Sequence, residues 1–291
     1  MAEIFSTDSF VLGDRRVNRL GYGAMQLAGP NAFGPPKDRA EAVLLLREAV
    51  ERGVNHIDTS DYYGPHTTNE VIREALHPYH DVLIATKVGA TRGAEGSWDK
   101  AASRNDLTAA VHDNLRNLGL DVLEVVNMRA MSEGFGPPTE FSLEEPLTVL
   151  ADLQRQGLIK HIGLSNVTAA QIADARKIVD IVCVQNMYNV GNRADDSLID
   201  QLAEHGTAYV PFFPIGHLSP AQLAAVGAVA ERIDATPLQV ALAWLLQRSP
   251  NLLLISGTSS RTHLRQNLAA AEIRLSNDDL VDLNRVAGLS D

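Results

Sequence analysis

Three side chains in the first third of the chain have the types and spacing of a proton-donor site. Asp58 lies in the short, mostly apolar run Asn55–Ser60, and Lys87 is the one charge in the apolar run Val82–Val88. A buried charge without a partner costs many kcal/mol, so the carboxylate and the ammonium are expected to pair across neighbouring strands. Tyr63 follows Asp58 by five residues, just beyond the end of the strand, and is expected to lie above the pair.

Tyr63 is the expected proton donor of this arrangement. Free tyrosine has a pKa of about 10, which is too high for an efficient acid at neutral pH. A nearby ammonium stabilises the phenolate, so Lys87 is expected to lower the pKa of Tyr63, while Asp58 balances and orients Lys87. Two alternatives remain at this point. The charges form only a buried ion pair beside an ordinary loop tyrosine, or Tyr62 is the donor.

Composition and length predict one large folded domain that spans residues 1–291. Apolar residues make up 45% of the chain, which is enough for a full core. The formal net charge of −11 argues against a nucleic-acid-binding protein, and the longest apolar run, Val240–Leu246, is far too short for a membrane span. The single cysteine, Cys183, excludes an internal disulfide and is expected to be a buried, inert thiol. We expect a cytoplasmic protein; a monomer is compatible with the sequence, which does not determine the oligomeric state.

Strand-like and helix-like runs alternate along the chain. Strands are predicted near Leu20–Met25, Asn55–Ser60, Val82–Val88, Leu123–Met128, Ile159–Leu164, Ile181–Gln185, Ala208–Phe212 and Leu252–Ile255. Helices are predicted at Arg39–Arg52, Thr68–Leu76, Arg104–Leu118, Leu143–Gln156, Ala169–Val179, Asp195–His205, Pro237–Gln247 and Thr262–Ala271. Eight such repeats in one chain indicate a closed parallel α/β barrel, the (β/α)8 or TIM barrel. Catalytic groups of such barrels lie at the carboxyl ends of the strands and in the loops that follow.

Three additions to the barrel are predicted. Phe5–Leu12 and Arg16–Leu20 read as an N-terminal hairpin, Leu218–Ile233 as a helix inserted before the last full repeat, and Ser276–Val286 as a C-terminal helix. Helix-start signals support the pattern. Ser142 with Glu145 and Thr168 with Gln171 match capping boxes, and Ser219-Pro220 and Thr236-Pro237 put proline at the first helical position.

Five motifs, in order, resemble the aldo-keto reductase family along nearly the whole chain. They are Arg19–Gly23, then Asn55-x-x-Asp58-Thr59 with Tyr63-Gly64, then Ala85-Thr86-Lys87, Gly163–Asn166 and Gly257–Ser260. The resemblance implies a single barrel that reduces an aldehyde or ketone to an alcohol with NADPH. It also implies that the proton donor is the tyrosine immediately before Gly64, which is Tyr63.

One position departs from the family pattern. Most family members carry a substrate-orienting histidine at this position, and this chain has Arg129 there. An arginine is permanently charged and donates through a planar fork, so it can bond the substrate carbonyl together with a second acceptor beside it. Its charge is also expected to lower the pKa of Tyr63. The alternative is a loop arginine paired with an acid such as Glu133.

The resemblance also implies which residues bind NADPH. Ser165, Asn166 and Gln185 offer polar groups to the nicotinamide carboxamide, Tyr209 stacks on the nicotinamide ring, and the segment 210–216 offers backbone groups to the pyrophosphate. The full expected set is Gly23, Ala24, Met25, Asp58, Ser165, Asn166, Gln185, Tyr209, Val210, Phe212, Gly216, Gly257, Thr258, Ser259, Ser260, His263, Gln266 and Asn267. For Tyr209 the alternative is an ordinary core aromatic.

The start of the last barrel helix suits the 2′-phosphate of NADPH. A helix N-terminus favours anions, hydroxyl groups precede it, and Arg261, His263 and Arg265 follow. Gly257 replaces the lysine that many family members carry there, which weakens the expected preference for NADPH over NADH. No Gly-x-Gly-x-x-Gly dinucleotide motif is present in the sequence, and no metal site is expected from the spacing of the histidines.

Within the family, Val125–Arg129 and Tyr209–Pro214 look like a bacterial subgroup that includes pyridoxal reductases. Pyridoxal carries a phenolic oxygen ortho to its aldehyde, and a forked arginine could hold both oxygens. The expected partner is therefore a small-molecule carbonyl compound. The alternatives are a broad aldehyde-detoxifying reductase and a redox-sensing NADPH-binding protein of the kind found among potassium-channel β subunits.

Overall fold

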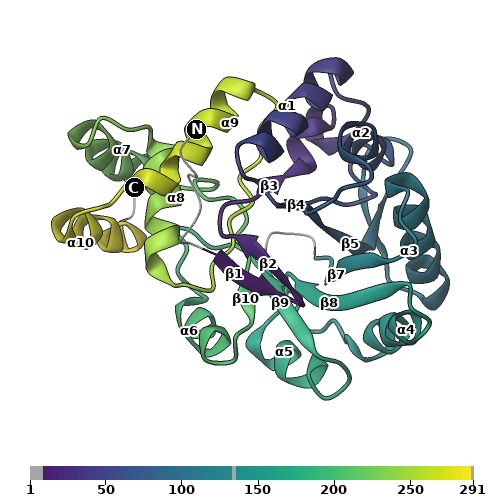
Figure 1. Ribbon diagram of the computed structural model, residues 1–291. Helices are drawn as coiled ribbons and strands as arrows, with labels where there is room; N and C mark the ends of the chain where they lie inside the picture. Colours follow the sequence, from purple (N-terminus) through teal and green to yellow (C-terminus); the bar gives the residue numbers. More distant parts are fainter. Residues whose placement is uncertain (1–8, 133–135, 290–291) are drawn as a thin grey trace.

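A ring of parallel strands forms the centre of the computed structural model, which describes residues 9–132 and 136–289 (Figure 1). Seven strands lie side by side in the order β3-β4-β5-β7-β8-β9-β10. They are β3 (Tyr22–Gly23), β4 (His56–Asp58), β5 (Leu83–Arg92), β7 (Leu123–Arg129), β8 (Ile159–Ser165), β9 (Ile181–Gln185) and β10 (Ala208–Tyr209). Together with the helices outside them, these strands confirm the predicted (β/α)8 barrel.

The eighth position of the ring is a short segment rather than a regular strand. Single parallel bridges join Leu252 to Tyr209 on one side and Leu254 to Leu20 on the other. The backbone N–H of Leu253 donates to the carbonyl oxygen of Tyr209 (2.9 Å), and that of Gly21 donates to Leu254 (2.8 Å). The predicted strand at 252–255 is therefore in place and closes the barrel, but it contributes only one bridge to each neighbour.

Helices surround the ring, and most begin and end within a few residues of their predicted bounds. The helices are α1 (Arg39–Glu51), α2 (Thr67–Leu76), α3 (Arg104–Leu118), α4 (Glu144–Arg155), α5 (Ala169–Ala175), α6 (Asp196–Glu204), α7 (Pro220–Arg232), α8 (Pro237–Arg248), α9 (Arg261–Ala269) and α10 (Asn277–Arg285). No helix in the described part of the chain is long and apolar enough to cross a membrane.

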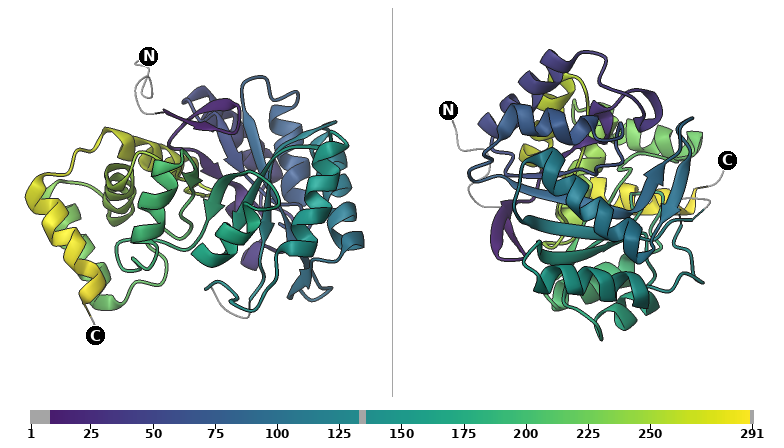
Figure 2. Two further views of the ribbon diagram at one scale, coloured as in Figure 1. Left: turned by 90° about the horizontal axis from the view of Figure 1, so that it is seen from below. Right: turned by 90° about the vertical axis from the view of Figure 1, so that its right-hand side faces the viewer.

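The three predicted additions are present. The hairpin consists of β1 (Ser9–Leu12) and β2 (Arg15–Asn18), paired antiparallel, while the predicted residues 5–8 lie outside the described residues. The hairpin contributes two side chains to the apolar cluster inside the barrel, so it closes one end of the ring. The inserted helix is α7 and the C-terminal helix is α10; both lie to one side of the barrel (Figure 2).

Most predicted helix caps are confirmed, and one is wrong. Thr168, Ser219 and Thr236 each accept a hydrogen bond from the backbone N–H three residues later. At α4 the cap position is Leu143, one residue later than predicted, and it makes no side-chain cap bond. The Ser142 hydroxyl instead accepts from the backbone N–H of Glu144, so no capping box forms there.

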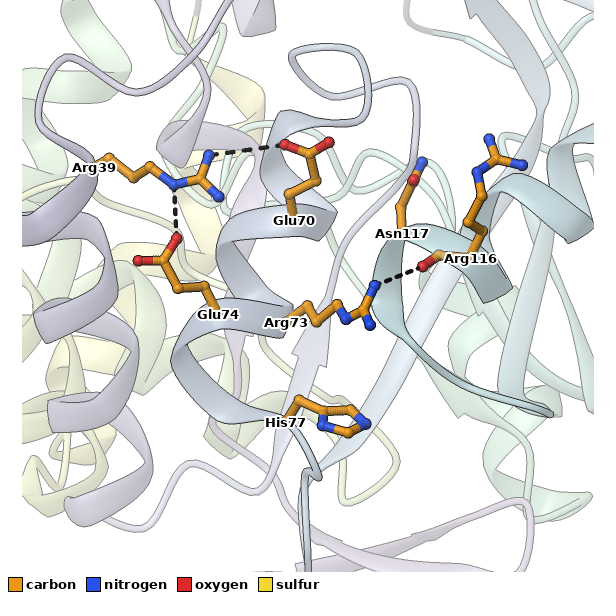
Figure 3. A pocket seen from close by; sticks show the side chains of 7 residues that line it. All are labelled: Arg39, Glu70, Arg73, Glu74, His77, Arg116 and Asn117. Carbon is orange, nitrogen blue, oxygen red and sulfur yellow. Dashed lines mark hydrogen bonds and ion pairs between the residues drawn. The ribbon is translucent and has the colours of Figure 1, made fainter.

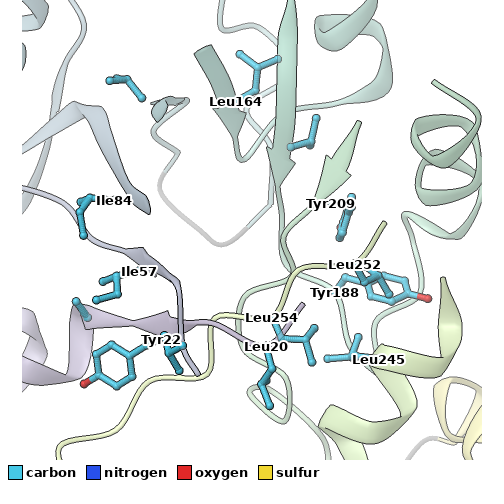
Figure 4. Packing of buried hydrophobic residues seen from close by; sticks show 14 of the residues in the cluster. Leu20, Tyr22, Ile57, Ile84, Leu164, Tyr188, Tyr209, Leu245, Leu252 and Leu254 are labelled. Carbon is cyan, nitrogen blue, oxygen red and sulfur yellow. The ribbon is translucent and has the colours of Figure 1, made fainter. Parts of the chain in front are cut away.

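Side chains of the ring alternate between two separate packing layers. Outward-facing residues such as Ile57, Ile84 and Leu164 pack against the helices in one large apolar cluster (Figure 4). Inward-facing residues such as Leu83 and Val125 form a second, smaller cluster inside the ring. Because successive side chains of a strand point to opposite faces, this alternation decides which polar residues reach the inside of the barrel.

Candidate active site

Asp58 and Lys87 form a buried ion pair inside the barrel, as predicted. Both lie on inward-facing positions of the neighbouring strands β4 and β5, and the ammonium donates to Asp58 Oδ1 in a close contact. Lys87 also donates to the carbonyl oxygen of Thr59 (3.1 Å), and Gln185 Nε2 donates to Asp58 Oδ2 (2.9 Å). Both carboxylate oxygens are thus satisfied, which offsets the cost of burying the charges.

Tyr63 lies beside this pair, with its ring centroid 5.2 Å from Lys87 Nζ. The residue is 7% exposed, and no hydrogen bond joins its hydroxyl to another of the described residues. Burial and the Asp58 carboxylate raise the pKa of Tyr63 well above the usual tyrosine value, while the nearby Arg129 lowers it. Lys87 donates to Asp58 and to a backbone carbonyl oxygen, and the lowering of the Tyr63 pKa expected from it stays a prediction. Arg129 is a cation that lowers the pKa of Tyr63, as also predicted.

Tyr62 differs from Tyr63 in its surroundings. Its ring meets the ring of Tyr63 edge to face at 5.3 Å, and its hydroxyl is buried without a partner in the described part of the chain. Burial raises the pKa of Tyr62 to about 12. The Tyr63 hydroxyl, by contrast, is not among the completely buried atoms, so it is better placed to meet a substrate, which favours Tyr63 as the donor.

Arg129 ends β7 at the mouth of the barrel and is half-buried. Its Nη1 donates to Ser165 Oγ (3.0 Å), and its guanidinium lies 5.5 Å from the ring centroid of Phe212. One edge of the fork is therefore anchored to the neighbouring strand. The alternative partner Glu133 lies outside the described residues.

Asn166 shows an unfilled hydrogen-bonding capacity at the end of β8. Its backbone adopts a left-handed conformation with φ of 63°, which is uncommon for a residue other than glycine. Its Nδ2 donates to the carbonyl oxygens of Ala130 (3.0 Å) and Gly136 (3.1 Å) and to Ser132 Oγ (3.2 Å). Its Oδ1 is buried and has no partner among the described residues, so it can accept a bond from an amide group.

Tyr209 does not reach the site, contrary to the prediction. It occupies an outward-facing position of β10, is completely buried, and donates from its hydroxyl to Asp195 Oδ2 (2.8 Å). Its ring packs against Tyr188 between the barrel and the helices. It is therefore a core aromatic, and the aromatic ring that the sequence offers at the mouth is Phe212, next to Arg129.

Gly23 and Gly257 bring the first and last ring segments into backbone contact at the mouth. A Cβ on Gly257 would lie 2.3 Å from the carbonyl oxygen of Gly23, so a side chain is excluded there. The Tyr22 hydroxyl donates to the carbonyl oxygen of Thr258 (2.6 Å) and fixes the same loop, while Met25 packs in the cluster that contains Tyr63.

The start of α9 has the predicted cap but not the predicted free charges. Ser260 Oγ accepts from the backbone N–H of His263, whose side chain is exposed. Arg261 Nε and Arg265 Nε both donate to the carboxylate of Glu48, each at 2.5 Å. These bonds, together with one from Arg52, hold the pKa of Glu48 far below its usual value.

Trp98 is a residue of the mouth that the sequence analysis missed. β5 continues beyond the ring and pairs antiparallel with β6 (Trp98–Ala101), which brings Trp98 edge to face against Tyr62 (5.6 Å) and Tyr63 (6.5 Å). Trp98 is 42% exposed, and the guanidinium of Arg92 lies 4.0 Å from its ring centroid. A large exposed aromatic held on three sides is typical of a binding wall. The only signal in the sequence was an isolated tryptophan between turn residues.

The pocket shown in Figure 3 lies away from this site, on the outer side of the barrel. It has a volume of about 510 Å³ and is lined by Arg39, Glu70, Arg73, Glu74, His77, Arg116 and Asn117. Arg39 is paired with Glu70 (3.8 Å) and Glu74 (2.7 Å), and Arg73 donates to the carbonyl oxygen of Arg116 (3.1 Å). Because these charges neutralise one another, the pocket has no distinctive chemistry.

Comparison with known proteins identifies the family of the chain. Residues 19–287 match the model of the aldo/keto reductase family. The chain is 62% identical to pyridoxine 4-dehydrogenase of Escherichia coli K12 over 284 residues, which cover 97% of this chain and 99% of that protein. It is 34% identical to an uncharacterised oxidoreductase of Schizosaccharomyces pombe, and the match covers 94% of this chain and 88% of that protein.

Solved structures give the same result for the fold. A thermostable aldo-keto reductase crystallised with the inhibitor epalrestat superposes with a TM-score of 0.79 at 30% identity, covering 96% of this chain and 99% of that one. An aldo/keto reductase of Klebsiella pneumoniae crystallised with NADP and acetate superposes with a TM-score of 0.78 at 23% identity. The match covers 96% of this chain and 95% of that one. With its family match spanning nearly the whole chain, this protein belongs to the aldo/keto reductase family of oxidoreductases.

Proposed function

We propose that the protein reduces an aldehyde with NADPH, that pyridoxal is its substrate and pyridoxine the product, and that Tyr63 donates the proton. The observation that carries this proposal is the buried Asp58–Lys87 pair beside a tyrosine whose hydroxyl is unbonded among the described residues. The 62% identity to a pyridoxine 4-dehydrogenase supports the choice of substrate.

The polar groups at the mouth fit NADPH. Asn166 Oδ1 and Asn267 Nδ2 are both buried, and neither has a partner among the described residues, so an acceptor and a donor are open at two separate places. We assign the carboxamide to Ser165, Asn166 and Gln185, the face of the nicotinamide to Phe212, and the phosphates to the start of α9. When bound there, NADPH supplies the hydride.

The protein's own groups then complete the reduction. Tyr63 gives its hydroxyl proton to the carbonyl oxygen as that oxygen becomes an alkoxide, and Lys87 balances the charge of Asp58 beneath it. The free edge of the Arg129 fork holds the same oxygen. Trp98 and Phe212 flank the mouth as aromatic walls, which suits a planar heteroaromatic substrate. A reducing cytoplasm is the compartment that suits the buried thiol of Cys183, whose pKa burial raises to about 12.

We expect the protein to bind NADPH more tightly than NADH, with a steeper loss of affinity for NADPH as salt rises. The reason is the surplus of positive charge at the start of α9, where three arginines, Arg52, Arg261 and Arg265, meet two carboxylates, Glu48 and the more distant Glu41 (4.0 Å from Arg261). Replacing Arg261 and Arg265 by alanine should narrow the ratio of the two dissociation constants by about tenfold, the scale of one charge-assisted hydrogen bond. Fluorescence titration with each cofactor measures this ratio.

Glu48→Gln is the matched control for this experiment, because it removes the carboxylate and leaves both arginines. This variant should widen the ratio between the dissociation constants of NADH and NADPH, since Glu48 no longer neutralises the guanidinium charges. Equal affinities for NADPH and NADH in the unaltered protein would refute the cofactor assignment.

Arg129 is expected to favour substrates with a hydroxyl group ortho to the aldehyde. Its Nη1 already bonds Ser165, and the rest of the fork is available to two neighbouring oxygens. Since a hydrogen bond to a charged group contributes about 1.5–3 kcal/mol, loss of the second acceptor should lower kcat/KM by about tenfold or more. The measurement compares salicylaldehyde with benzaldehyde.

Arg129→His should flatten this preference while activity toward benzaldehyde is kept, because histidine supplies one donor in place of a fork. If the ratio between the two aldehydes is unchanged in Arg129→His, then Arg129 is structural. The choice of pyridoxal would then rest on similarity alone.

Two other functions make different predictions. A broad aldehyde-detoxifying reductase would turn over plain and ortho-hydroxylated aldehydes equally well. A redox-sensing binding protein would hold NADPH without consuming it. The complete arrangement of Asp58, Tyr63 and Lys87 favours catalysis over sensing.

A further inference from the structure

Four completely buried polar side chains lie behind the Asp58–Lys87 pair, on the outer face of the barrel wall. They form one chain of hydrogen bonds, which we call the threonine–asparagine relay: Thr59, Asn69, Asn114 and Thr86. Thr59 Oγ1 donates to Asn69 Oδ1 (2.8 Å), Asn69 Nδ2 donates to Asn114 Oδ1 (3.0 Å), and Thr86 Oγ1 donates to the same Asn114 oxygen. The relay therefore ties β4 to β5 through α2 and α3, which cover these strands (Figure 1).

The two threonines are the immediate chain neighbours of the charged pair. Thr59 follows Asp58, and Thr86 precedes Lys87. Because side chains alternate along a strand, each threonine points outward where its neighbour points inward. The relay thus anchors, from outside, the same two backbone segments that carry the ion pair inside.

The relay also reaches the segment that carries Tyr63. The second Nδ2 hydrogen of Asn69 goes to Asp61 Oδ1 (3.1 Å), and Asn117 Nδ2 donates to the same oxygen (2.8 Å). Asp61 Oδ2 contacts His66 Nδ1 at 2.6 Å. Asp61 is only two residues before Tyr63, so one connected network holds all three segments of the proton-donor site.

This network is satisfied but surrounded by apolar side chains. Asn114 Nδ2 donates to the carbonyl oxygen of Ala110 (2.8 Å), so both ends of the Asn114 amide are used, as are both ends of the Asn69 amide. Buried polar groups cost free energy unless every partner is supplied, and an apolar pair would fill the same layer without that requirement. A polar relay also fixes the relative orientation of the strands, because each hydrogen bond restricts the angle as well as the distance between the groups that it joins.

We propose that the threonine–asparagine relay is a positioning device that sets the separation and orientation of Asp58, Lys87 and Tyr63. Thr59, Asn69, Asn114 and Thr86 act through the three groups of the site and touch no substrate themselves. The proposal rests on the role of Tyr63 proposed above. It adds that catalytic geometry is determined from the outer layer of the barrel.

Thr86→Val tests this proposal, because it removes one hydroxyl at nearly constant volume. We expect kcat for pyridoxal and for benzaldehyde to fall by about tenfold or more, since small misplacements of catalytic groups have effects of that size or larger. The dissociation constant of NADPH should change by less than about twofold, because none of the relay's hydrogen bonds goes to a residue to which we assign the cofactor. Thr86→Ser keeps the hydroxyl and should recover most of kcat.

Thr68→Val is the matched control. Thr68 is next to Asn69 on α2 and completely buried, but its hydroxyl has no partner in the described part of the chain. This variant should keep kcat within about twofold. If Thr86→Val behaves like Thr68→Val, or if Thr86→Ser loses as much kcat as Thr86→Val, the relay has no positioning role.

A double-mutant cycle supplies a readout that does not depend on turnover. The free energy of unfolding in urea is measured for Thr86→Val, Lys87→Met and the double variant, and then for Thr68→Val in place of Thr86→Val. If the relay couples the two sites, the changes in the free energy of unfolding should be non-additive in the cycle with Thr86→Val and additive in the cycle with Thr68→Val. Additive effects in both cycles would overturn the proposal. An unaltered protein that reduces no aldehyde would overturn the proposed function instead, and the cycle would still decide on the relay.

Discussion

Tyr63→Phe is expected to lower kcat for pyridoxal reduction by about a hundredfold or more, the scale of a lost general acid. The affinity for NADPH should stay nearly unchanged. The substitution removes only the hydroxyl, which has no partner among the described residues, so neither the ion pair nor the packing of the ring is disturbed. Stopped-flow measurement of kcat, with NADPH affinity from fluorescence titration, separates the loss of chemistry from a loss of binding.

Tyr62→Phe is the control for this experiment. Its hydroxyl is buried and has no partner in the part of the chain that the structure describes, so its removal should be nearly neutral for turnover and for folding. Should Tyr62→Phe prove to be the damaging change and Tyr63→Phe the neutral one, the proton donor is Tyr62.

Lys87→Met is expected to damage turnover on the same scale and to destabilise the protein as well. Removing one partner of a buried ion pair costs about 3–5 kcal/mol, because the remaining charge is left uncompensated. Of its hydrogen bonds to described side chains, Asp58 would keep the one from Gln185. Unfolding in urea measures this loss of stability.

The pH profile of Lys87→Met gives a second readout. The Asp58 carboxylate already raises the pKa of Tyr63, and without Lys87 its charge is no longer balanced. The pKa of Tyr63 should rise further, so the tyrosine keeps its proton to higher pH but gives it up less readily. The alkaline limb of kcat against pH should therefore move upward while the rate at neutral pH falls. An unchanged profile in an active variant would remove Lys87 from the mechanism.

The double variant with Asp58→Asn and Lys87→Met separates the two effects. Because it removes both charges, it should recover much of the lost stability without recovering turnover. A double variant that is as unstable as Lys87→Met alone would show that the charge imbalance is not the cause.

Much of the fold and the centre of the site could be predicted from the sequence, because the signals there are local. Asp58 and Lys87 interrupt apolar strands, and a charge in such a run has few physically acceptable positions other than paired inside the barrel. Helix starts such as Thr168 and Ser219 carry their own caps. The alternation of strand side chains also contained the correction for Tyr209. Its two chain neighbours, Ala208 and Val210, point inward, so Tyr209 must point outward.

The parts that were missed depend on contacts between distant residues. Arg261 and Arg265 lie on α9 and meet Glu48 on α1, more than two hundred residues earlier, so their charges looked free in the sequence. Trp98 reaches Tyr63 only because β5 extends beyond the ring and turns back as β6. No local pattern indicates either contact.

We propose that this barrel reduces pyridoxal with NADPH through the hydroxyl of Tyr63. Single-turnover mixing of the protein, preloaded with NADPH, against pyridoxal tests it most directly, with the loss of NADPH absorbance as the signal. We predict a complete decay in the unaltered protein and a decay at least about a hundredfold slower in Tyr63→Phe. Equal decays in the two proteins, or no decay with pyridoxal where benzaldehyde reacts, would contradict the account.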